Sequence, residues 1–355
     1  MRLIKFIFII LIISAITYLT IQKSDLFQET TIKKWNYTMP KESKLKSKDI
    51  PEERKLSKTF QGDLFDWIGK TSEALLNKMG EPKSQDLSAY GYTWWVYKDS
   101  NDQYIQFGIK DDKIVTIFAA GEDLGTDPLK IGQKYDSVKD EFHFDDKVNY
   151  RHGVSTYQFE LTTKDLKKQP LIKVTDNVFV QLYFDTFNER LTSLRILDGD
   201  VLLNHRPYQM VYRGSLEEPK KLSDDKWLEV EKGMEQQIFD ITNVIRKAYD
   251  KNELKWEESV REVAFLHSKD MEENDYFSHH NLDGGGLKER LADKDIFYSA
   301  AGENIAAEYS DAPAVVAGWL NSEEHRDALL NESYTHLGVG VYRLYYTQNF
   351  LTKYE

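Results

Sequence analysis

Three short stretches near the C-terminus decide the fold of this chain. Residues 264–279 read AFLHSKDMEENDYFSH, residues 302–306 read GENIA and residues 319–326 read WLNSEEHR. The first stretch begins in an apolar pattern of helical spacing and ends in a polar loop that runs to three consecutive glycines. Together they carry chemically versatile side chains that are far apart along the chain, namely His279, Glu303 and His325.

Helix and strand patterns surround these stretches. Apolar residues recur at helical spacing in two long segments, Met234–Ala248 and Val260–Met271, which predicts a helix in each. Alternating β-branched and aromatic residues predict two strands at the end of the chain, Leu337–Tyr342 and Tyr345–Phe350. Shorter helices are predicted between them, at Leu287–Ala292, Ala314–Leu320 and Glu324–Leu330.

In this order, the motifs resemble the bacterial branch of the CAP family, which comprises cysteine-rich secretory proteins, antigen 5 and pathogenesis-related-1 proteins. The signature also includes Asn243-x-x-Arg246, Leu337-Gly-Val-Gly-Val341 and Thr347-Gln-Asn-Phe350. The resemblance implies an α-β-α sandwich with a central antiparallel sheet for residues 229–355. We therefore expect the chain to be an α+β protein.

The resemblance also implies a functional cleft. In the family, the residues matching His279, Glu303 and His325 converge in one surface cleft. Two neutral imidazoles can bind Zn²⁺ or another divalent cation and leave positions open for water or a ligand. A nearby carboxylate can bind the metal, orient a histidine or act as a base on bound water. We predict that His279 and His325 are metal ligands.

Each of these residues also has a simpler interpretation. His279 follows a Phe-Ser pair in a loop and could be merely exposed. Glu303 could cap a following helix through its backbone, and His325 could simply pack. The matching order of the motifs favours the shared cleft over these separate explanations.

The fourth cleft residue is less well defined. Animal and plant members of the family carry a second cleft glutamate at the position of Ser322, with Glu323 and Glu324 following here. We place Glu323 in the cleft and leave the other two as alternatives. His267 falls beside apolar helix positions and is predicted to be a core histidine, and His280 is predicted to be a bystander.

Composition limits the class of protein. The 355 residues predict about two domains with accessory segments. The chain has no cysteine, which excludes disulfides, thiolate catalysis and cysteine-ligated zinc. Its net charge of -12 argues against a nucleic-acid partner. The sequence contains no H-E-x-x-H or G-x-S-x-G motif.

The N-terminus predicts a membrane anchor at residues 1–22. Phe6–Ile21 is almost continuously apolar, and at about 1.5 Å per residue such a run nearly spans a bilayer core. Arg2 and Lys5 precede it and are expected to stay in the cytoplasm. Cleavage as a signal peptide is the alternative, although no A-x-A-like site is found. We expect a single-pass protein of the cell membrane, with a Lys- and Ser-rich tether at 23–59.

A tandem repeat is predicted at residues 60–204. Ile68-Gly69-Lys70 and Ile131-Gly132-Gln133 each open a unit of one or two helices followed by three strands. The region resembles the domain often found N-terminal to CAP domains in exported proteins of Gram-positive-type bacteria. Trp94 and Trp95 lie in an aromatic strand, where packing is favoured over a sugar-stacking platform.

This organisation favours binding over catalysis. A polar segment at 205–228 is predicted to link the repeat to the CAP domain. A tethered extracellular CAP domain suits a binding module of the cell envelope, with a lipid, cell-wall or protein ligand. The alternatives are a metal-dependent hydrolase using water activated at His279, Glu303 and His325, or a purely structural envelope protein. Whether the chain is an enzyme stays open.

Overall fold

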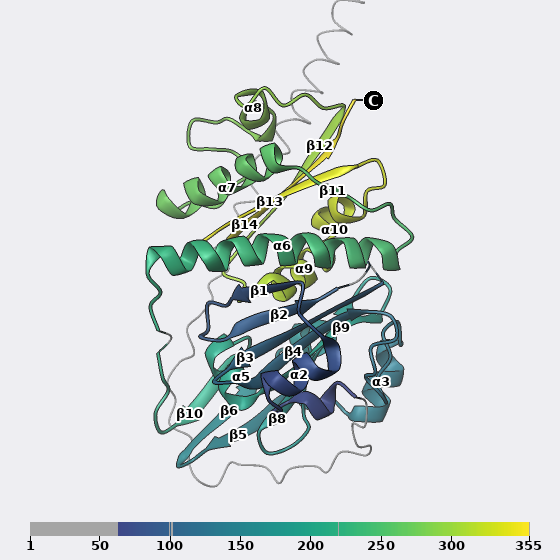
Figure 1. Cartoon of the computed structure of the whole chain (residues 1–355), viewed down its shortest axis with the longest axis vertical. Helices are drawn as coiled ribbons and strands as arrows, with labels where there is room; N and C mark the ends of the chain where they lie inside the picture. The colour runs from purple at the N-terminus through teal and green to yellow at the C-terminus, as the bar shows by residue number, and fades with distance from the viewer. Residues whose placement is uncertain (1–62, 99, 101, 219, 355) are drawn as a thin grey trace, which may run out of the picture. The chain divides into compact units, whose positions relative to one another are not determined.

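The computed structural model describes residues 63–98, 100, 102–218 and 220–354, and Figure 1 shows how their helices and strands are arranged. The predicted anchor at 1–22 and the predicted tether at 23–59 lie outside the described residues. Within the described residues, no helix is long and apolar enough to cross a membrane. Helices and strands occur in both halves, so the predicted α+β class is confirmed.

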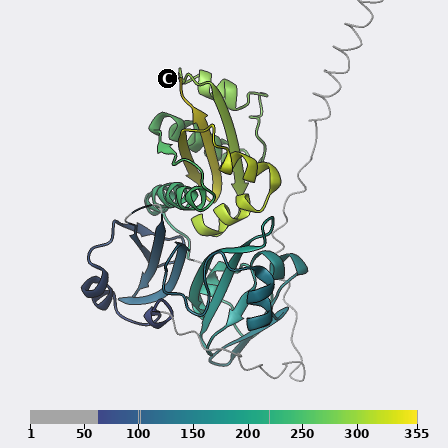
Figure 2. The same cartoon turned by 90° about the vertical axis from the view of Figure 1, so that its right-hand side faces the viewer.

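The N-terminal half is built from two successive units of helices and strands, drawn in blue and in teal in Figure 2. The first unit contains η1 (Phe65–Trp67), α2 (Ser72–Met79), β1 (Ser84–Leu87), β2 (Thr93–Tyr97), β3 (Gln103–Lys110) and β4 (Lys113–Gly121). The second begins with α3 (Tyr135–Phe142), β5 (Lys147–His152), β6 (Ser155–Glu160) and α4 (Thr163–Lys168). It continues with β7 (Leu171–Lys173), β8 (Val178–Asp185), β9 (Arg190–Asp198), α5 (Gly199–His205) and β10 (Gln209–Arg213).

Equivalent hydrogen bonds relate the two units, as expected for a repeat. The Gly69 N–H donates to the Ile114 carbonyl over 2.8 Å, and the Gly132 N–H donates to the Leu191 carbonyl over 2.7 Å. Both glycines have a φ of 84°, a left-handed conformation that glycine adopts without a side-chain clash. The repeated Ile-Gly opening therefore meets the same backbone requirement in each unit.

One seven-stranded sheet, in the order β1-β2-β3-β4-β9-β8-β7, joins the two units through the antiparallel pair β4 and β9. A smaller sheet has the order β10-β6-β5. Trp94 of β2 is only 2% exposed and meets Tyr92 edge to face, and Trp95 packs partly buried against a second apolar cluster. Both tryptophans therefore pack in the N-terminal half, as the sequence predicts.

The segment 205–228, predicted to be a linker, is partly built into helices and strands. β10 pairs antiparallel with β6, and Met210 of β10 is 2% exposed in an apolar cluster of this half. The next helix already begins at Asp224. The structure corrects the linker prediction for residues 209–213 and 224–228, because the short apolar run of Met210, Val211 and Tyr212 within a polar segment is too weak a pattern to mark a strand.

The C-terminal half is an α-β-α sandwich around a sheet of order β11-β13-β14-β12. Its elements are α6 (Asp224–Ala248), β11 (Lys255–Trp256), α7 (Glu258–Glu273), α8 (Leu287–Ala292), β12 (Ala300–Ala307), α9 (Ala312–Leu320), α10 (Glu323–Leu330), β13 (His336–Tyr342) and β14 (Tyr345–Thr352). Helices α7 and α8 cover one face of the sheet, and α6, α9 and α10 cover the other (Figure 1). The predicted sandwich is confirmed.

The Leu-Gly-Val-Gly-Val motif sets the spacing between β13 and α7. A Cβ placed on Gly340 would lie 1.9 Å from the Phe265 nitrogen, and one on Gly338 would lie 2.2 Å from the Arg261 nitrogen. The backbones of the helix and the strand are therefore in direct contact. The alternate residues of the strand are buried in the core on the α6 side, namely Leu337, Val339 and Val341.

The Asn243-x-x-Arg246 motif holds neighbouring loops in place through hydrogen bonds. Arg246 is fully buried, and its Nη1 donates to the carbonyls of Leu329 and Asn331 over 2.8 and 2.9 Å. Asn243 exchanges two hydrogen bonds with the backbone of Leu254, over 3.0 and 2.9 Å. Both residues satisfy buried backbone groups, so this motif is structural.

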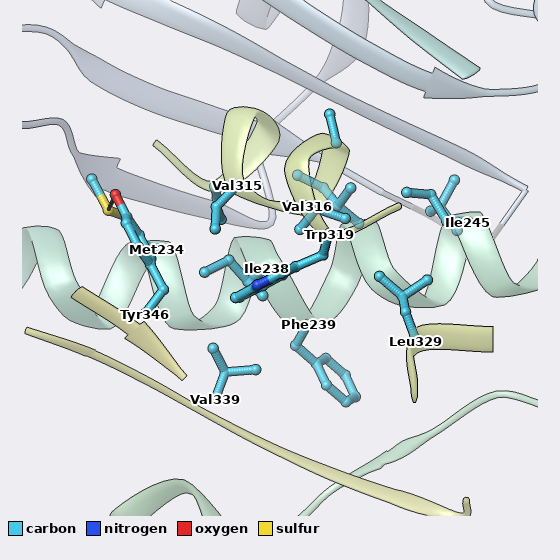
Figure 3. Close-up of a cluster of buried hydrophobic side chains, with 14 of the residues drawn as sticks. Met234, Ile238, Phe239, Ile245, Val315, Val316, Trp319, Leu329, Val339 and Tyr346 are labelled. Atoms are coloured by element: carbon cyan, nitrogen blue, oxygen red, sulfur yellow. Dashed lines mark hydrogen bonds between the residues drawn. The ribbon is translucent and has the colours of Figure 1, made fainter. Parts of the chain in front are cut away.

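One apolar cluster crosses from the C-terminal half into the N-terminal half. In Figure 3, Ile238 of α6 and Trp319 of α9 lie at its centre, with Val339 of β13 beside them. The same cluster contains Val96 and Phe118 from the N-terminal strands. The described residues of both halves belong to one compact unit, and α6 runs along the boundary between the halves in Figure 1.

Candidate ligand cleft

The three predicted cleft residues lie on different elements of the sandwich. His279 is in the loop after α7, Glu303 is in β12 and His325 is in the first turn of α10. Glu303 pairs in register with Asn349 of β14. It therefore occupies a strand, and the alternative in which it caps a following helix is wrong.

A hydrogen bond joins His279 to Glu303. The distance from His279 Nδ1 to Glu303 Oε1 is 2.9 Å. Because a carboxylate only accepts, Nδ1 carries the proton and Nε2 of the neutral ring keeps its lone pair. The side chain of His279 is 47% exposed, whereas that of Glu303 is 4% exposed. An exposed imidazole is thus oriented by a buried carboxylate.

Arg290 of α8 compensates the buried charge of Glu303. Its Nη2 lies 2.6 Å from Glu303 Oε2, and its Nη1 donates to the His279 carbonyl and to Asn281 Oδ1 over 3.1 and 2.8 Å. Burial alone would raise the pKa of Glu303, but the hydrogen bond from His279 and the charge of Arg290 outweigh it and hold that pKa below its usual range. Both carboxylate oxygens are engaged, so Glu303 is placed to orient His279.

His267 is buried, as predicted, and also lies beside the cleft. It is 1% exposed, its Nε2 donates to the Ser278 carbonyl over 3.0 Å, and the same nitrogen is 4.0 Å from Glu303 Oε1. Burial lowers the pKa of His267, so the ring is neutral at physiological pH. It supports the backbone just before His279. His280 is exposed, and its backbone N–H donates to Ser278 Oγ.

His325 is held by Ser322. The distance from His325 Nδ1 to Ser322 Oγ is 2.7 Å, and Asn304 Nδ2 donates to the His325 carbonyl over 3.0 Å. Burial, followed by the charge of His279, lowers the pKa of His325. Among the described residues, no hydrogen bond joins the two rings. Ser322 therefore contacts the cleft by orienting this histidine.

The glutamates after Ser322 are less engaged. Glu323 and Glu324 are both exposed at the start of α10. In the part of the chain that the structure describes, no hydrogen bond or ion pair joins Glu323 to His279, Glu303 or His325. The described residues also contain no group of three or more His, Asp or Glu side chains arranged to hold a metal ion. Two imidazoles are thus the donors that this cleft offers, and further ligands would have to come from water or a bound molecule.

The sandwich, its glycine-spaced strand and the His-Glu pair together define a CAP domain. Residues 239–354 match the cysteine-rich secretory protein family, and residues 68–208 match the CAP-associated N-terminal family. The chain belongs to the CAP family, as a member that carries the CAP-associated domain before the CAP domain.

The matches to similar proteins extend over most of this chain. The chain is 47% identical over 290 residues to the uncharacterized membrane protein YlbC of Bacillus subtilis, in a match that covers 82% of this chain and 84% of that protein. A crystal structure of an extracellular SCP-domain protein from Bacillus anthracis is 43% identical, with a TM-score of 0.78 over 87% of this chain and 100% of that one. A cysteine-rich secretory protein from Staphylococcus aureus is 28% identical, with a TM-score of 0.72 over 82% of this chain and 93% of that one.

Proposed function

We propose that this chain is a membrane-tethered extracellular protein whose CAP domain binds a ligand of the cell envelope through His279, Glu303 and His325. The similarity to a Bacillus subtilis protein named as a membrane protein supports the tether, and so does the apolar run at Phe6–Ile21. The similarity to a Bacillus anthracis protein described as extracellular supports the location.

The observation that carries the proposal is the orientation of the two histidines. Each ring is held through Nδ1, His279 by Glu303 and His325 by Ser322. Among the described residues, neither Nε2 atom has a hydrogen-bond partner. For His279, the buried carboxylate of Glu303 fixes the tautomer and leaves Nε2 free, which is the arrangement found around metal-binding histidines. Ser322 Oγ can donate or accept, so it orients the His325 ring without fixing its tautomer. The donor set therefore suits Zn²⁺ or a similar cation that water or an envelope ligand completes.

A cavity next to the cleft offers room for part of a larger ligand. Its volume is about 500 Å³, and it shares His267 and Arg290 with the surroundings of Glu303. Leu266 and Leu282 also line it and are exposed, at 44% and 71%. Charged residues share the walls with these leucines, among them Asp270, Asp293 and Lys294. A cavity that mixes apolar and charged side chains suits a ligand with both characters, such as a lipid or a cell-wall peptide.

The geometry favours binding over hydrolysis. A general base works best when its pKa lies near the operating pH, whereas Arg290 and His279 hold the pKa of Glu303 below its usual range. Both oxygens of that carboxylate are already hydrogen-bonded. Glu303 is therefore a poor base for activating water, and we rank the binding module above the hydrolase.

Calorimetric titration with Zn²⁺ tests the cleft. The full chain, purified in a mild detergent, is expected to bind zinc reversibly, and the double variant His279→Ala/His325→Ala is expected to lose binding while staying folded. Affinity should fall as the pH drops through the histidine range, near about 6.5, because a protonated imidazole cannot bind a metal. Glu303→Gln should weaken binding by roughly 10- to 100-fold if Glu303 orients His279.

The matched control is His280→Ala, which removes an exposed neighbouring histidine outside the cleft and should leave zinc affinity unchanged. Circular dichroism would show that each variant retains the fold. If the double histidine variant bound zinc as tightly as the unmodified chain, the shared metal-binding cleft would be refuted.

A further inference from the structure

The corner between α9 and α10 carries cleft residues and interdomain contacts side by side. Ser322 and His325 belong to the cleft, and the flanking residues Asn321 and Arg326 reach the N-terminal half. The partners of both flanking residues lie at the end of β8. The same six-residue segment therefore carries a candidate ligand-binding histidine and the attachment to the other domain.

Both polar atoms of the Asn321 side-chain amide form hydrogen bonds. Its Nδ2 donates to the Phe184 carbonyl over 2.8 Å and to the Ala317 carbonyl over 3.0 Å. Its Oδ1 accepts from the backbone N–H and from the hydroxyl of Thr186, over 2.8 and 2.7 Å. These bonds join the C-terminal end of α9 to the backbone that leaves β8.

Arg326 forms an ion pair across the same boundary. Its Nη1 lies 2.8 Å from an oxygen of Asp185, whose side chain is 0% exposed, and also donates to the Leu320 carbonyl over 3.1 Å. The guanidinium lies over the rings of Phe187 and Tyr249, 4.9 and 5.1 Å from their centres. Because the carboxylate is buried, loss of this pair would leave a charge without compensation.

The N-terminal end of α9 is attached to the same domain. Asp311 caps the helix through the Ala314 N–H, and its two oxygens accept from Arg195 Nη2 over 2.8 and 2.7 Å. The side chains of Arg195 and Asp311 are 1% and 3% exposed. Strands β8 and β9 therefore hold α9 at both ends, and α10 with His325 follows immediately.

We infer that the CAP-associated domain is a clamp that fixes the α9–α10 corner and so positions His325 for ligand binding. Asp185 is the main positioning residue, acting through Arg326, and Thr186 contributes through Asn321. The assignment of His325 to a ligand rests on the proposed function, whereas the clamp itself rests on the interdomain contacts. Without Asp185, the corner would keep its helices and the bonds of Asn321 to Phe184 and Thr186, but it would lose the ion pair that holds Arg326 against the end of β8.

The test compares Asp185→Asn with the unmodified full chain in detergent. Asparagine has nearly the same shape but lacks the charge that pairs with Arg326. Backbone amide exchange in residues 321–330 is expected to rise at least about tenfold, with α7 unchanged, because loss of a local attachment frees a local segment. Zinc affinity is expected to fall by about tenfold, the range for losing a group that orients a ligand. Asp176→Asn is the control, since Asp176 is a fully exposed aspartate of the same domain.

The possible outcomes separate the clamp from the proposed function. Faster amide exchange confined to residues 321–330 of Asp185→Asn supports the clamp. This holds even if the unmodified chain binds no zinc, a result that would refute only the proposed function. Unchanged exchange and zinc affinity in folded Asp185→Asn would overturn the clamp, and so would an equal rise in α7 and α10, which would indicate global destabilisation. If Asp185→Asn does not fold, Thr186→Val decides by the same readouts, because Thr186 is exposed and only one hydrogen bond to Asn321 is lost.

Discussion

A buried histidine at the boundary between the two halves should make the stability of this protein depend on pH. Arg195 Nη1 lies 2.9 Å from His205 Nδ1, and the Tyr92 hydroxyl lies 2.9 Å from His205 Nε2. Since arginine only donates, Nδ1 must be the acceptor and the ring must be neutral. Burial, followed by the charge of Arg195, lowers the pKa of His205 to about 3, against the opposing charge of Asp311.

The direction and size of the effect follow from proton binding. The unfolded chain binds a proton at His205 near a pH of about 6.5, whereas the folded chain does so only near about 3. The stability due to the neutral ring is therefore fully present above about pH 6.5 and is lost as the pH falls toward 3. Between pH 8 and pH 5 the loss covers about 1.5 pH units, or about 2 kcal/mol.

Urea unfolding of the full chain in detergent, followed by tryptophan fluorescence at several pH values, measures this loss. His205→Gln keeps an acceptor for Arg195 but cannot titrate, so its free energy of unfolding should fall about 2 kcal/mol less between pH 8 and pH 5. The difference between the two proteins removes the contribution of the other buried histidines. His280→Gln, a change at an exposed ring, should behave like the unmodified chain. Equal losses in the His205 variant and the unmodified chain would refute the argument.

Further expectations concern the sandwich and its neighbour. Gly340→Ala should lower the free energy of unfolding by about 1–3 kcal/mol or more, because its Cβ would press on the Phe265 nitrogen, and an unchanged urea midpoint would contradict the direct contact. His267→Ala should cost about 1–3 kcal/mol through the lost bond to Ser278, as chemical denaturation can show. A fragment of residues 224–355 should melt well below the full chain, because it exposes the part of its core that the N-terminal strands cover; equal melting temperatures in calorimetry would show that the halves are independent.

Periodicity in the amino-acid sequence locates the helices and strands whose residues pack on one face. Helix α7 and strands β13 and β14 are predictable to within two residues at each end because their apolar spacing is regular. Strand β10 is not, because its apolar residues, Met210, Val211 and Tyr212, are only a short run within a polar segment. That polarity is typical of a linker, and only the pairing of β10 with β6 in the folded chain shows that the segment is a strand.

The cleft is only partly predictable for a related reason. An ordered motif identifies His279, Glu303 and His325, but their partners come from elsewhere in the chain. Arg290 lies on a short helix whose pattern reveals only that it is amphipathic, and its bond to Glu303 depends on tertiary structure. Composition and spacing identify the residue types in a site, but they do not show which buried charge each one compensates.

Buried ion pairs attach the two halves to each other. Asp311 pairs with Arg195, and Asp240 pairs with Lys98 over 2.7 Å with side chains 4% and 9% exposed. Each pair takes one member from each half. Separating the halves would therefore leave each of these buried charges without its partner, which is energetically costly. The apolar cluster crosses the same boundary. The two domains therefore bury apolar and charged groups against each other and form one packed structure. A change in the CAP-associated domain can affect the cleft of the CAP domain only because the two are packed in this way.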